Sequence, residues 1–519
     1  MTDVLTEPER ADDRDAAAAG RPVGRGLELI VFAVGVATLG AEIAAARLLA
    51  PFFGASTIVW ANTIATVLVA LSIGYWLGGR IGDRYPTRAA LARWVLGASL
   101  LVALVPLVAR PFLRVSVAAF DSIDLGAAAG SLVGVLALVA VPVLVLGAVA
   151  PWAIRLRVER VEDAGRTAGR LYAISTVGSL LGTFLAALLA IPLIGTQRTF
   201  IACALLLALA ASVVLPRRYL IVPAAVAALL ALPVGTTKQA SGGRVVEERE
   251  TEYQYARVVE QPDGERWLEL NEGQAIHSIY RSDTVLTGNV WDGYLALPFS
   301  VLGRPPRSVA ILGNGAGTTV RAYGRYFPET QIDAVEIDPE LTEMGRRWFA
   351  LRERPGLRLV ADDARPFLRR TERRYEAIFV DAYRQPYIPF YLTTVEFFDL
   401  VRSRLEPGGV LVVNAGHPEG SDELERVLSA GVGTAMPNVA RHPITRFNTL
   451  IVGGLRAPSA ARMRAAAERL PGELQPVFAE ASLALGPALR GGRAYTDDHA
   501  PVEWLIDRSI VEFAAGESD

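Results

Sequence analysis

The chain has 519 residues, 51% of them hydrophobic, and its 52 Lys and Arg residues nearly balance its 54 Asp and Glu residues. A mean hydropathy of +0.31 is high for a soluble protein, so part of the chain is expected to lie in a lipid bilayer. The net charge of −2 gives no electrostatic reason to expect a nucleic-acid partner. A single cysteine and four scattered histidines exclude an internal disulfide and do not favour a metal site, so we expect no metal.

A polar tail precedes a long apolar region. Residues 1–26 are charged and rich in alanine, lack the basic-then-apolar order of a signal peptide, and are predicted to form a disordered cytoplasmic tail. Residues 27–235 contain apolar runs near the length of about 20 residues that crosses a bilayer, which predicts a multi-pass transmembrane domain of the cell membrane. About seven spans are predicted, at 28–48, 57–79, 89–109, 127–152, 169–194, 199–215 and 219–235.

Arginines are concentrated in alternate connections between these spans. They accompany the connections after the second, fourth and sixth spans: Arg80, Arg84, Arg88 and Arg93; Arg155, Arg157, Arg160, Arg166 and Arg170; Arg217 and Arg218. The positive-inside rule therefore predicts a cytoplasmic N-terminus. Seven spans would place the C-terminal half outside, whereas counting the last two as one span or a re-entrant pair would keep it inside, so its side stays open. Glu42 and Arg47 in the first span indicate either a ligand path or a charge pair between helices.

The second half has the texture of a folded α/β protein. A linker is expected at 236–243, a β-rich lead-in at 244–292 and an α/β domain at 293–519. Apolar strands are predicted at 309–312, 332–337, 357–360, 377–381 and 410–414, with helices between them. This alternation is typical of a parallel, doubly wound sheet of the Rossmann type.

Glycines or acids follow four of these strands, at the edge where open parallel sheets bind ligands. The candidate nucleoside-binding residues are Gly313, Gly315 and Gly317 after the first strand, Glu336 and Asp338 after the second, and Asp362 and Asp363 after the third; Asp381 follows the fourth. Glu336 lies about 20 residues past the glycines, a spacing at which an acid accepts hydrogen bonds from ribose hydroxyls. Helix capping is the alternative for these acids, and it is slightly favoured for Asp363.

The order of these motifs resembles the spermidine synthase family of aminopropyltransferases, which has a class I methyltransferase-like fold. Tyr253-Gln254 and residues 268–274 resemble that family's N-terminal β segment, and further similarity lies at 388–398 and 496–503. Apolar segments such as 40–54 and 74–84 resemble its bacterial membrane-fused branch.

The resemblance implies roles for four residues in polyamine biosynthesis. Glu336 would bind ribose, Asp362 the adenine amino group and Gln254 the thioether region, while Asp381 would be the catalytic base that deprotonates an amine. It implies decarboxylated S-adenosylmethionine, or S-adenosylmethionine, as co-substrate, with no prosthetic group. A small-molecule amine is the implied partner, and a homodimer follows by analogy alone.

Three positions depart from the family's pattern. Ala316 stands where the family has an aspartate that binds the donor's ammonium, and Arg384 lies where a second acid would follow Asp381. Asp292 is what remains of an acidic stretch before the glycine loop. Two alternatives to aminopropyl transfer therefore stay open: a transporter or membrane sensor with a degenerate nucleoside- or polyamine-binding domain, and an S-adenosylmethionine-dependent methyltransferase.

Overall fold

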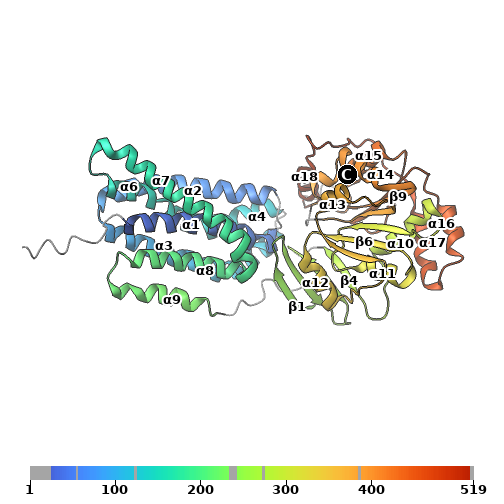
Figure 1. The fold of residues 1–519 in the computed structure, drawn as a ribbon, viewed down its shortest axis with the longest axis horizontal. Coiled ribbons are helices and arrows are strands. Elements are labelled where there is room, and N and C mark those ends of the chain that lie inside the picture. Colours follow the sequence, from blue (N-terminus) through green and yellow to red (C-terminus); the bar gives the residue numbers. More distant parts are fainter. Residues whose placement is uncertain are drawn as a thin grey trace, which may run out of the picture.

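The computed structural model describes residues 25–53, 57–121, 126–232, 242–271, 275–383 and 387–514. Most of the predicted tail (1–24), most of the predicted linker (236–241) and Arg384 lie outside the described residues. Figure 1 shows a bundle of helices at one end of the molecule and an α/β part at the other. The predicted order, apolar helices followed by an α/β sheet, is confirmed.

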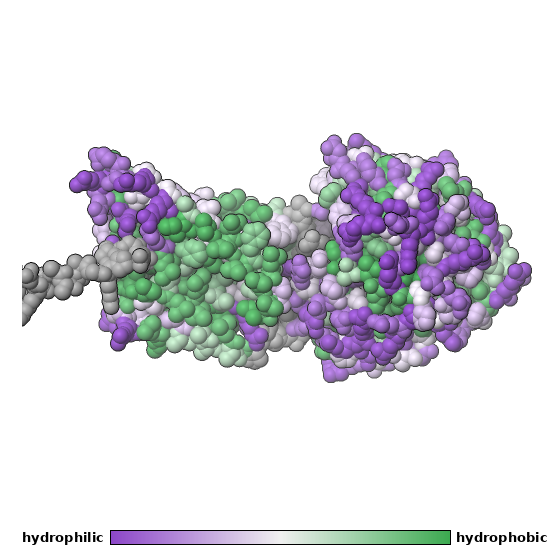
Figure 2. Space-filling view, in the orientation of Figure 1, coloured by the Kyte–Doolittle hydropathy of each residue, from purple (hydrophilic) through white to green (hydrophobic). Residues whose placement is uncertain are grey.

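The bundle is built from helices that lie side by side. Its elements are α1 (Arg25–Phe53), α2 (Thr57–Arg84), α3 (Arg88–Asp121), α4 (Gly126–Val135), η2 (Leu136–Ala140), α5 (Val141–Gly147), α6 (Val149–Arg157), η3 (Val161–Asp163), α7 (Ala164–Leu185), η4 (Ala186–Ala190), α8 (Ile191–Ser212), η5 (Arg217–Leu220) and α9 (Ile221–Leu229). Figure 2 shows apolar side chains covering the visible face of the bundle, with hydrophilic residues at the end far from the α/β part. Such a surface suits a bilayer.

Within the described ranges, five helical stretches are long and apolar enough to cross a membrane: Gly26–Phe53, Val59–Arg84, Arg88–Ala109, Gly130–Arg157 and Val161–Ser212. The last contains the fifth predicted span and most of the sixth. They are separated at Gly195, whose φ of 81° and ψ of 166° interrupt the helical backbone. The seventh predicted stretch contains the short helix α9, and its residues 233–235 are outside the described part. Seven crossings therefore remain a prediction.

A small antiparallel sheet follows the bundle. Its strands, in the order β1-β2-β3-β4, are β1 (Arg244–Glu250), β2 (Tyr255–Glu260), β3 (Arg266–Leu270) and β4 (Ile276–Tyr280). Ala256, Val258 and Leu268 of this sheet pack against Leu341 and Met344 of the helix α12 (Pro339–Trp348). The small sheet therefore lies beside the first half of the α/β domain.

The main sheet has the strand order β12-β10-β11-β9-β8-β5-β6-β7. Its strands are β5 (Ser308–Leu312), β6 (Gln331–Glu336), β7 (Leu357–Ala361), β8 (Tyr375–Val380), β9 (Leu405–Gly416), β10 (Asn438–Pro443), β11 (Asn448–Gly454) and β12 (Gly486–Pro487). The five strands from β9 to β7 are parallel, and β11 and β10 continue the sheet in antiparallel pairing. The predicted Rossmann-type sheet is confirmed, with an antiparallel edge added.

Helices cover both faces of this sheet, which is why the central strand β5 is apolar and buried from Val309 to Leu312. Val309 and Ile311 of β5 face one layer, and Ala310 and Leu312 face the other. The first layer contains α10 (Val290–Leu302), α11 (Thr318–Tyr326), α16 (Ala460–Ala467) and α17 (Gln475–Ala484). The second contains α13 (Ala364–Arg370), α14 (Val395–Arg404), α15 (Glu423–Ala435) and α18 (Val502–Ala514).

Candidate active site

A cleft of about 740 Å³ opens at the carboxyl edge of the parallel strands. Its walls come from the glycine loop, from the ends of β6, β7, β8 and β9, and from residues 252–254 and 275–277 of the small sheet. Of the predicted site residues, the cleft is lined by Gln254, Gly313, Gly315, Glu336, Asp362, Asp363 and Asp381. Side chains far apart in sequence thus meet where the sheet topology predicts a ligand.

Two positions of the glycine loop require glycine, because the backbone has a positive φ there and a Cβ atom would collide with neighbouring residues. Gly313 has a φ of 92°, and a Cβ atom there would lie 2.3 Å from the backbone oxygen of Asp381. Gly315 has a φ of 53°, and a Cβ atom there would lie 2.8 Å from Oγ of Ser278. The loop therefore passes close to both β8 and β4 while keeping backbone exposed to the cleft. Gly317 precedes helix α11 with a φ of 92° and does not line the cleft.

Glu336 is the last residue of β6 and is only 7% exposed. Its Oε2 accepts a hydrogen bond of 2.8 Å from the Gly315 amide, and its Oε1 accepts one of 3.1 Å from the Asp338 amide. Burial raises its pKa to about 7, although these amides pull the pKa the other way. A carboxylate has about four lone-pair sites, so two remain for hydroxyl donors in the cleft.

Asp338 lies beneath the cleft rather than in its wall. Its Oδ2 accepts hydrogen bonds from the Thr251 hydroxyl at 2.7 Å and from the Gln254 amide at 3.3 Å. Its Oδ1 caps helix α12 by accepting from the Glu340 amide. Burial raises the pKa of Asp338. Asp338 therefore holds the turn that carries Gln254 into the cleft, and its predicted contact with the nucleoside stays a prediction.

The two acids after β7 differ in their partners. Asp362 forms an ion pair with Arg370 at the rim of the cleft. Asp363 caps helix α13 by accepting from the Arg365 amide, and it also accepts a hydrogen bond of 2.6 Å from the Tyr391 hydroxyl. The capping alternative for Asp363 thus describes one of its contacts, and its other oxygen faces a tyrosine of the cleft wall.

Asp381 follows β8 on the opposite side of the glycine loop from Glu336, because β8 and β6 flank β5. The Asn414 amide donates a hydrogen bond of 2.8 Å to its Oδ1, and the Asn448 amide donates one of 3.0 Å to Asn414. Removal from bulk water raises the pKa of Asp381 to about 7, against the lowering effect of Asn414. A carboxylate with this pKa can take a proton near neutral pH.

Sequence reasoning did not identify several polar side chains of the cleft: Tyr383, Tyr391, Asn414 and Asn448. Asn414 belongs to β9, the fifth parallel strand, so extending the strand-end argument by one strand would have found it. His277 and His417, by contrast, are within reach of sequence reasoning, because His417 follows the fifth strand; both line the cleft. Nε2 of His417 lies 3.3 Å from the Thr449 hydroxyl, and its Nδ1 lies 2.9 Å from the Pro418 oxygen.

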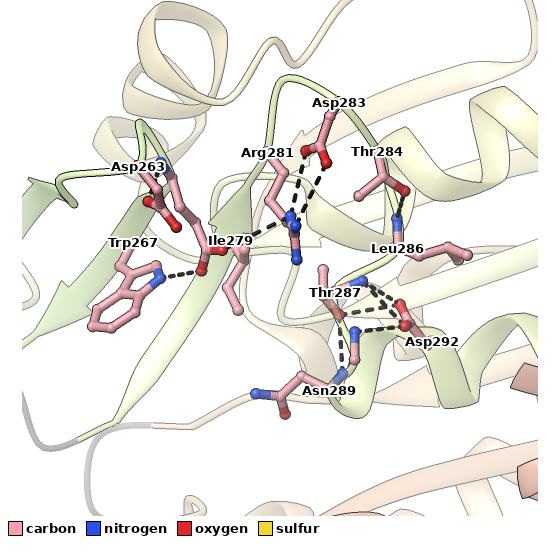
Figure 3. Close-up of polar contacts among 12 residues, drawn as sticks. Asp263, Trp267, Ile279, Arg281, Asp283, Thr284, Leu286, Thr287, Asn289 and Asp292 are labelled. Carbon is pink, nitrogen blue, oxygen red and sulfur yellow. Dashed lines mark hydrogen bonds and ion pairs between the residues drawn. The ribbon is translucent and has the colours of Figure 1, made fainter.

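Asp292 is not among the residues that line the cleft, and Figure 3 shows its carboxylate facing Thr287. Its carboxylate accepts hydrogen bonds from the amides of Thr287 and Gly288 and from the Thr287 hydroxyl, at 2.7 to 3.1 Å. It therefore stabilises the turn before α10. At a second departure from the family's pattern, Ala316 is fully buried and its amide donates to the Ser278 hydroxyl at 2.9 Å. Neither position offers the cleft a carboxylate for an ammonium group.

The part of the chain that forms this cleft is similar in sequence to known proteins. Residues 297–452 match the family described as the Spermine/spermidine synthase domain. The chain is 34% identical over 192 residues to the "Probable polyamine aminopropyl transferase" of Bifidobacterium longum, covering 37% of this chain and 42% of that protein. It is 34% identical over 112 residues to the polyamine aminopropyltransferase of Vibrio vulnificus, covering 21% and 38%. The chain thus spans less than half the length of these relatives.

Two solved structures also align with this chain at low sequence identity. A probable spermidine synthase from Corynebacterium glutamicum aligns with 49% of this chain and 98% of its own, with 19% identity and a TM-score of 0.38. Spermidine synthase from Thermotoga maritima aligns with 53% and 88%, with 16% identity and a TM-score of 0.37. The predicted resemblance is confirmed: the α/β half of this chain matches the spermine/spermidine synthase domain over residues that include most of its strand-end site.

Proposed function

We propose that this chain is a membrane-bound, aminopropyltransferase-like enzyme. It binds decarboxylated S-adenosylmethionine or a related adenosyl thioether and transfers an alkyl group to a small-molecule amine. The observation that carries the proposal is the placement of Glu336 and Asp381 on the two strands that flank the glycine loop. Glu336 offers acceptors for ribose hydroxyls, and Asp381 lies across the loop with a pKa of about 7. The family match supports the same chemistry.

The proposed step is a displacement at carbon. The amine nitrogen attacks the carbon bound to the donor's sulfonium; a C–N bond forms, the C–S bond breaks, and its electron pair stays on sulfur as a neutral thioether. An ammonium has no lone pair for this attack, so its proton must leave first. Asp381 takes that proton, and the Asn414 amide keeps the receiving carboxylate oriented toward the cleft.

A transfer assay with a labelled donor tests the proposal on the full chain. The wild type is expected to convert the donor into an alkylated amine and methylthioadenosine. Asp381→Asn keeps the shape of the side chain but removes the base, so product formation should fall by a factor of about 10²–10⁴ while nucleoside binding persists. Unchanged turnover in Asp381→Asn would refute the role of Asp381 as base.

Ala316 favours a second candidate, a methyltransferase that uses unmodified S-adenosylmethionine. An aspartate at this loop position would repel the donor's carboxylate, whereas the buried Ala316 methyl does not. The same assay separates the two, because a methyl donor would yield S-adenosylhomocysteine instead of methylthioadenosine. Transfer from the carboxylated donor alone would replace the first proposal by this one.

The apolar bundle surface is proposed to lie in a cell membrane, with the arginine-rich end in the cytoplasm. Two ion pairs join arginine-bearing connections to helix ends at one end of the bundle. Arg170 pairs with Glu28 at the start of α1 at 3.0 Å, and Arg155 pairs with Asp83 near the end of α2 at 2.8 Å. Figure 1 shows this end far from the α/β part. The α/β domain would then lie on the opposite side of the membrane from the N-terminus.

Thiol labelling tests this orientation, because Cys203 is the only cysteine and is buried in α8. In a Cys203→Ala background, Asp263→Cys places one thiol at an exposed turn of the small sheet, and Glu162→Cys places one at the arginine-rich end. A membrane-impermeant maleimide applied to intact spheroplasts should label Asp263→Cys alone. Labelling of Glu162→Cys alone would place the domain in the cytoplasm and leave the proposed chemistry untouched.

A further inference from the structure

The end of the bundle nearest the α/β part contacts the turn that lines the cleft. Arg47, one of the two charged residues predicted within the first span, lies in this end of α1. Its guanidinium donates to the backbone oxygen of Thr251 at 3.2 Å and to the backbone oxygen of Glu252. Two consecutive peptide groups of the turn are thereby held by one side chain of a bundle helix.

A second bundle helix holds the residue just before this turn. Near the break at Gly195, the Thr196 amide donates a hydrogen bond of 2.7 Å to Oε2 of Glu250, and the Thr196 hydroxyl donates to the same oxygen. Glu250 is the last residue of β1. Residues 250–252 are therefore fixed by α1 and α8 together, with three backbone or side-chain acceptors satisfied from the bundle.

The same turn is tied to the nucleoside end of the cleft. Thr251 and Gln254 both donate to Oδ2 of Asp338, and the Asp338 amide donates to Oε1 of Glu336. Glu252, Tyr253 and Gln254 themselves line the cleft. An unbroken series of contacts thus runs from Arg47, through the turn and Asp338, to the carboxylate assigned to ribose.

A planar guanidinium that donates to two successive carbonyls fixes the orientation of both peptide groups, which a flexible ammonium does less well. Removing it would leave two carbonyls to find other donors and would free the turn to move. A ligand that contacts Gln254 and Glu336 needs that turn in one position, so ligand and bundle favour the same conformation. Favouring one conformation from two sites is energetic coupling, and it is reciprocal.

We propose that Arg47 is a positioning residue for the cleft: it couples packing of helix α1 to nucleoside binding by fixing residues 251–254. This inference rests on the proposed function, because it takes the cleft ligand to be an adenosyl thioether. Its consequence is that ligand in the cleft stiffens the junction with α8, and that a change in the bundle alters affinity in the cleft.

Titration of the full chain in nanodiscs with methylthioadenosine tests the coupling. Arg47→Met should weaken binding about tenfold, and Arg47→Lys should recover part of the loss because it restores one donor and the charge. Thr196→Val removes only the hydroxyl bond to Glu250 and should weaken binding by a smaller factor. Arg155→Gln is the matched control, since it breaks an arginine–acid contact at the far end of the bundle and should bind as wild type.

Hydrogen exchange distinguishes coupling from a purely structural role of Arg47, because a structural role alone would not make exchange at Thr196 depend on the ligand. Methylthioadenosine should increase protection of the Thr196 amide in the wild type and not in Arg47→Met. Wild-type affinity in both Arg47→Met and Thr196→Val, with binding abolished by Glu336→Ala, would overturn the coupling alone. If Arg47→Met does not fold, Thr196→Val decides. A folded wild type that binds no nucleoside would overturn the proposed function and this inference with it.

Discussion

The side-chain amide of Asn414 donates a hydrogen bond of 2.8 Å to Oδ1 of Asp381, and the Asn448 amide donates in turn to the oxygen of Asn414. The bond from Asn448 determines which end of the Asn414 amide faces the carboxylate. Asp381 therefore meets an N–H donor, which favours its charged form against the effect of burial.

Asn414→Leu should move the pH dependence of transfer to higher pH. The pKa of Asp381 is about 7 in the wild type, and it should rise when the amide donor is removed. Less of the base is then ionised at neutral pH. Below the midpoint, kcat/KM should fall about tenfold for each unit of added pKa. The measurement is kcat/KM against pH for the variant and the wild type. An unmoved midpoint would show that Asn414 does not set the charge state of Asp381.

Nucleoside binding should release a proton from Glu336 at mildly acidic pH. In the free protein its pKa is raised from 4.5 to about 7. Ribose hydroxyls donate stronger hydrogen bonds to the ionised carboxylate than to the protonated carboxyl, so binding favours the ionised form. At pH 6 close to one proton should leave on binding, and at pH 8 almost none. Affinity should rise about tenfold per pH unit up to about 7 and then level off.

Calorimetry in two buffers of different ionisation enthalpy measures this release, and Glu336→Gln is the control that should abolish it. The raised pKa of Glu336 also affects folding stability, which should fall as pH rises, whereas affinity for the nucleoside should increase. Because the folded-state pKa is raised, the stabilisation that comes from holding this proton is present below about 4.5 and is lost as pH rises through about 7. Buffer-independent binding enthalpies at pH 6 would contradict the assignment of Glu336 to ribose.

Arg365→Met should destabilise the α/β domain. Arg365 is buried and donates to both oxygens of Asp497, at 2.7 and 2.6 Å, which ties the segment before α18 to helix α13. Asp497 is 43% exposed, so about 1–3 kcal/mol is expected rather than the cost of a fully buried pair. Thermal unfolding of the full chain measures the loss.

The control for Arg365→Met is Arg346→Met, which breaks the exposed ion pair with Glu343 and should lower the free energy of unfolding by less than about 1 kcal/mol. The Arg365 contact lowers the pKa of Asp497, so its stabilisation is present above the unfolded value near 3.8 and is lost as pH falls through the lowered pKa. Equal losses for the two variants would show that the Arg365 pair is no stronger than a surface contact.

Gly182→Ala should destabilise the bundle. A Cβ atom there would lie 2.2 Å from the backbone oxygen of Val36, so α1 and α7 would have to separate. Overpacking of this kind costs about 1–3 kcal/mol. Gly97→Ala is the matched control, because a Cβ atom there meets no atom within 4 Å. Equal thermal stability of the two variants would show that close approach of α1 and α7 is not required.

The strand-end residues could be predicted because a short stretch of sequence is enough to identify each strand and the residue that follows it. Apolar runs identify the parallel strands, and the polar residue after each run falls at one edge of the sheet, as Glu336 and Asp381 do. Asp338 shows the limit of this argument. Two residues past the strand end, its carboxylate holds a turn of the small sheet, 84 residues upstream at Gln254. No spacing in the sequence indicates that contact.

The contact of Arg47 with Thr251 was equally out of reach of sequence reasoning. An arginine in an apolar run indicates only that the charge needs partners, and these lie 204 and 205 residues away. The break at Gly195, in contrast, could be predicted from the sequence. The two apolar stretches on either side are predicted as separate spans, and the residue between them is a glycine with a positive φ, which glycine adopts readily.

Calorimetric titration of the full chain with decarboxylated S-adenosylmethionine, S-adenosylmethionine and methylthioadenosine tests the central claim most directly. The account predicts that the decarboxylated donor and methylthioadenosine bind at one site per chain and that Glu336→Ala abolishes both. Absence of binding by all three ligands, in a wild type that unfolds cooperatively, would contradict it.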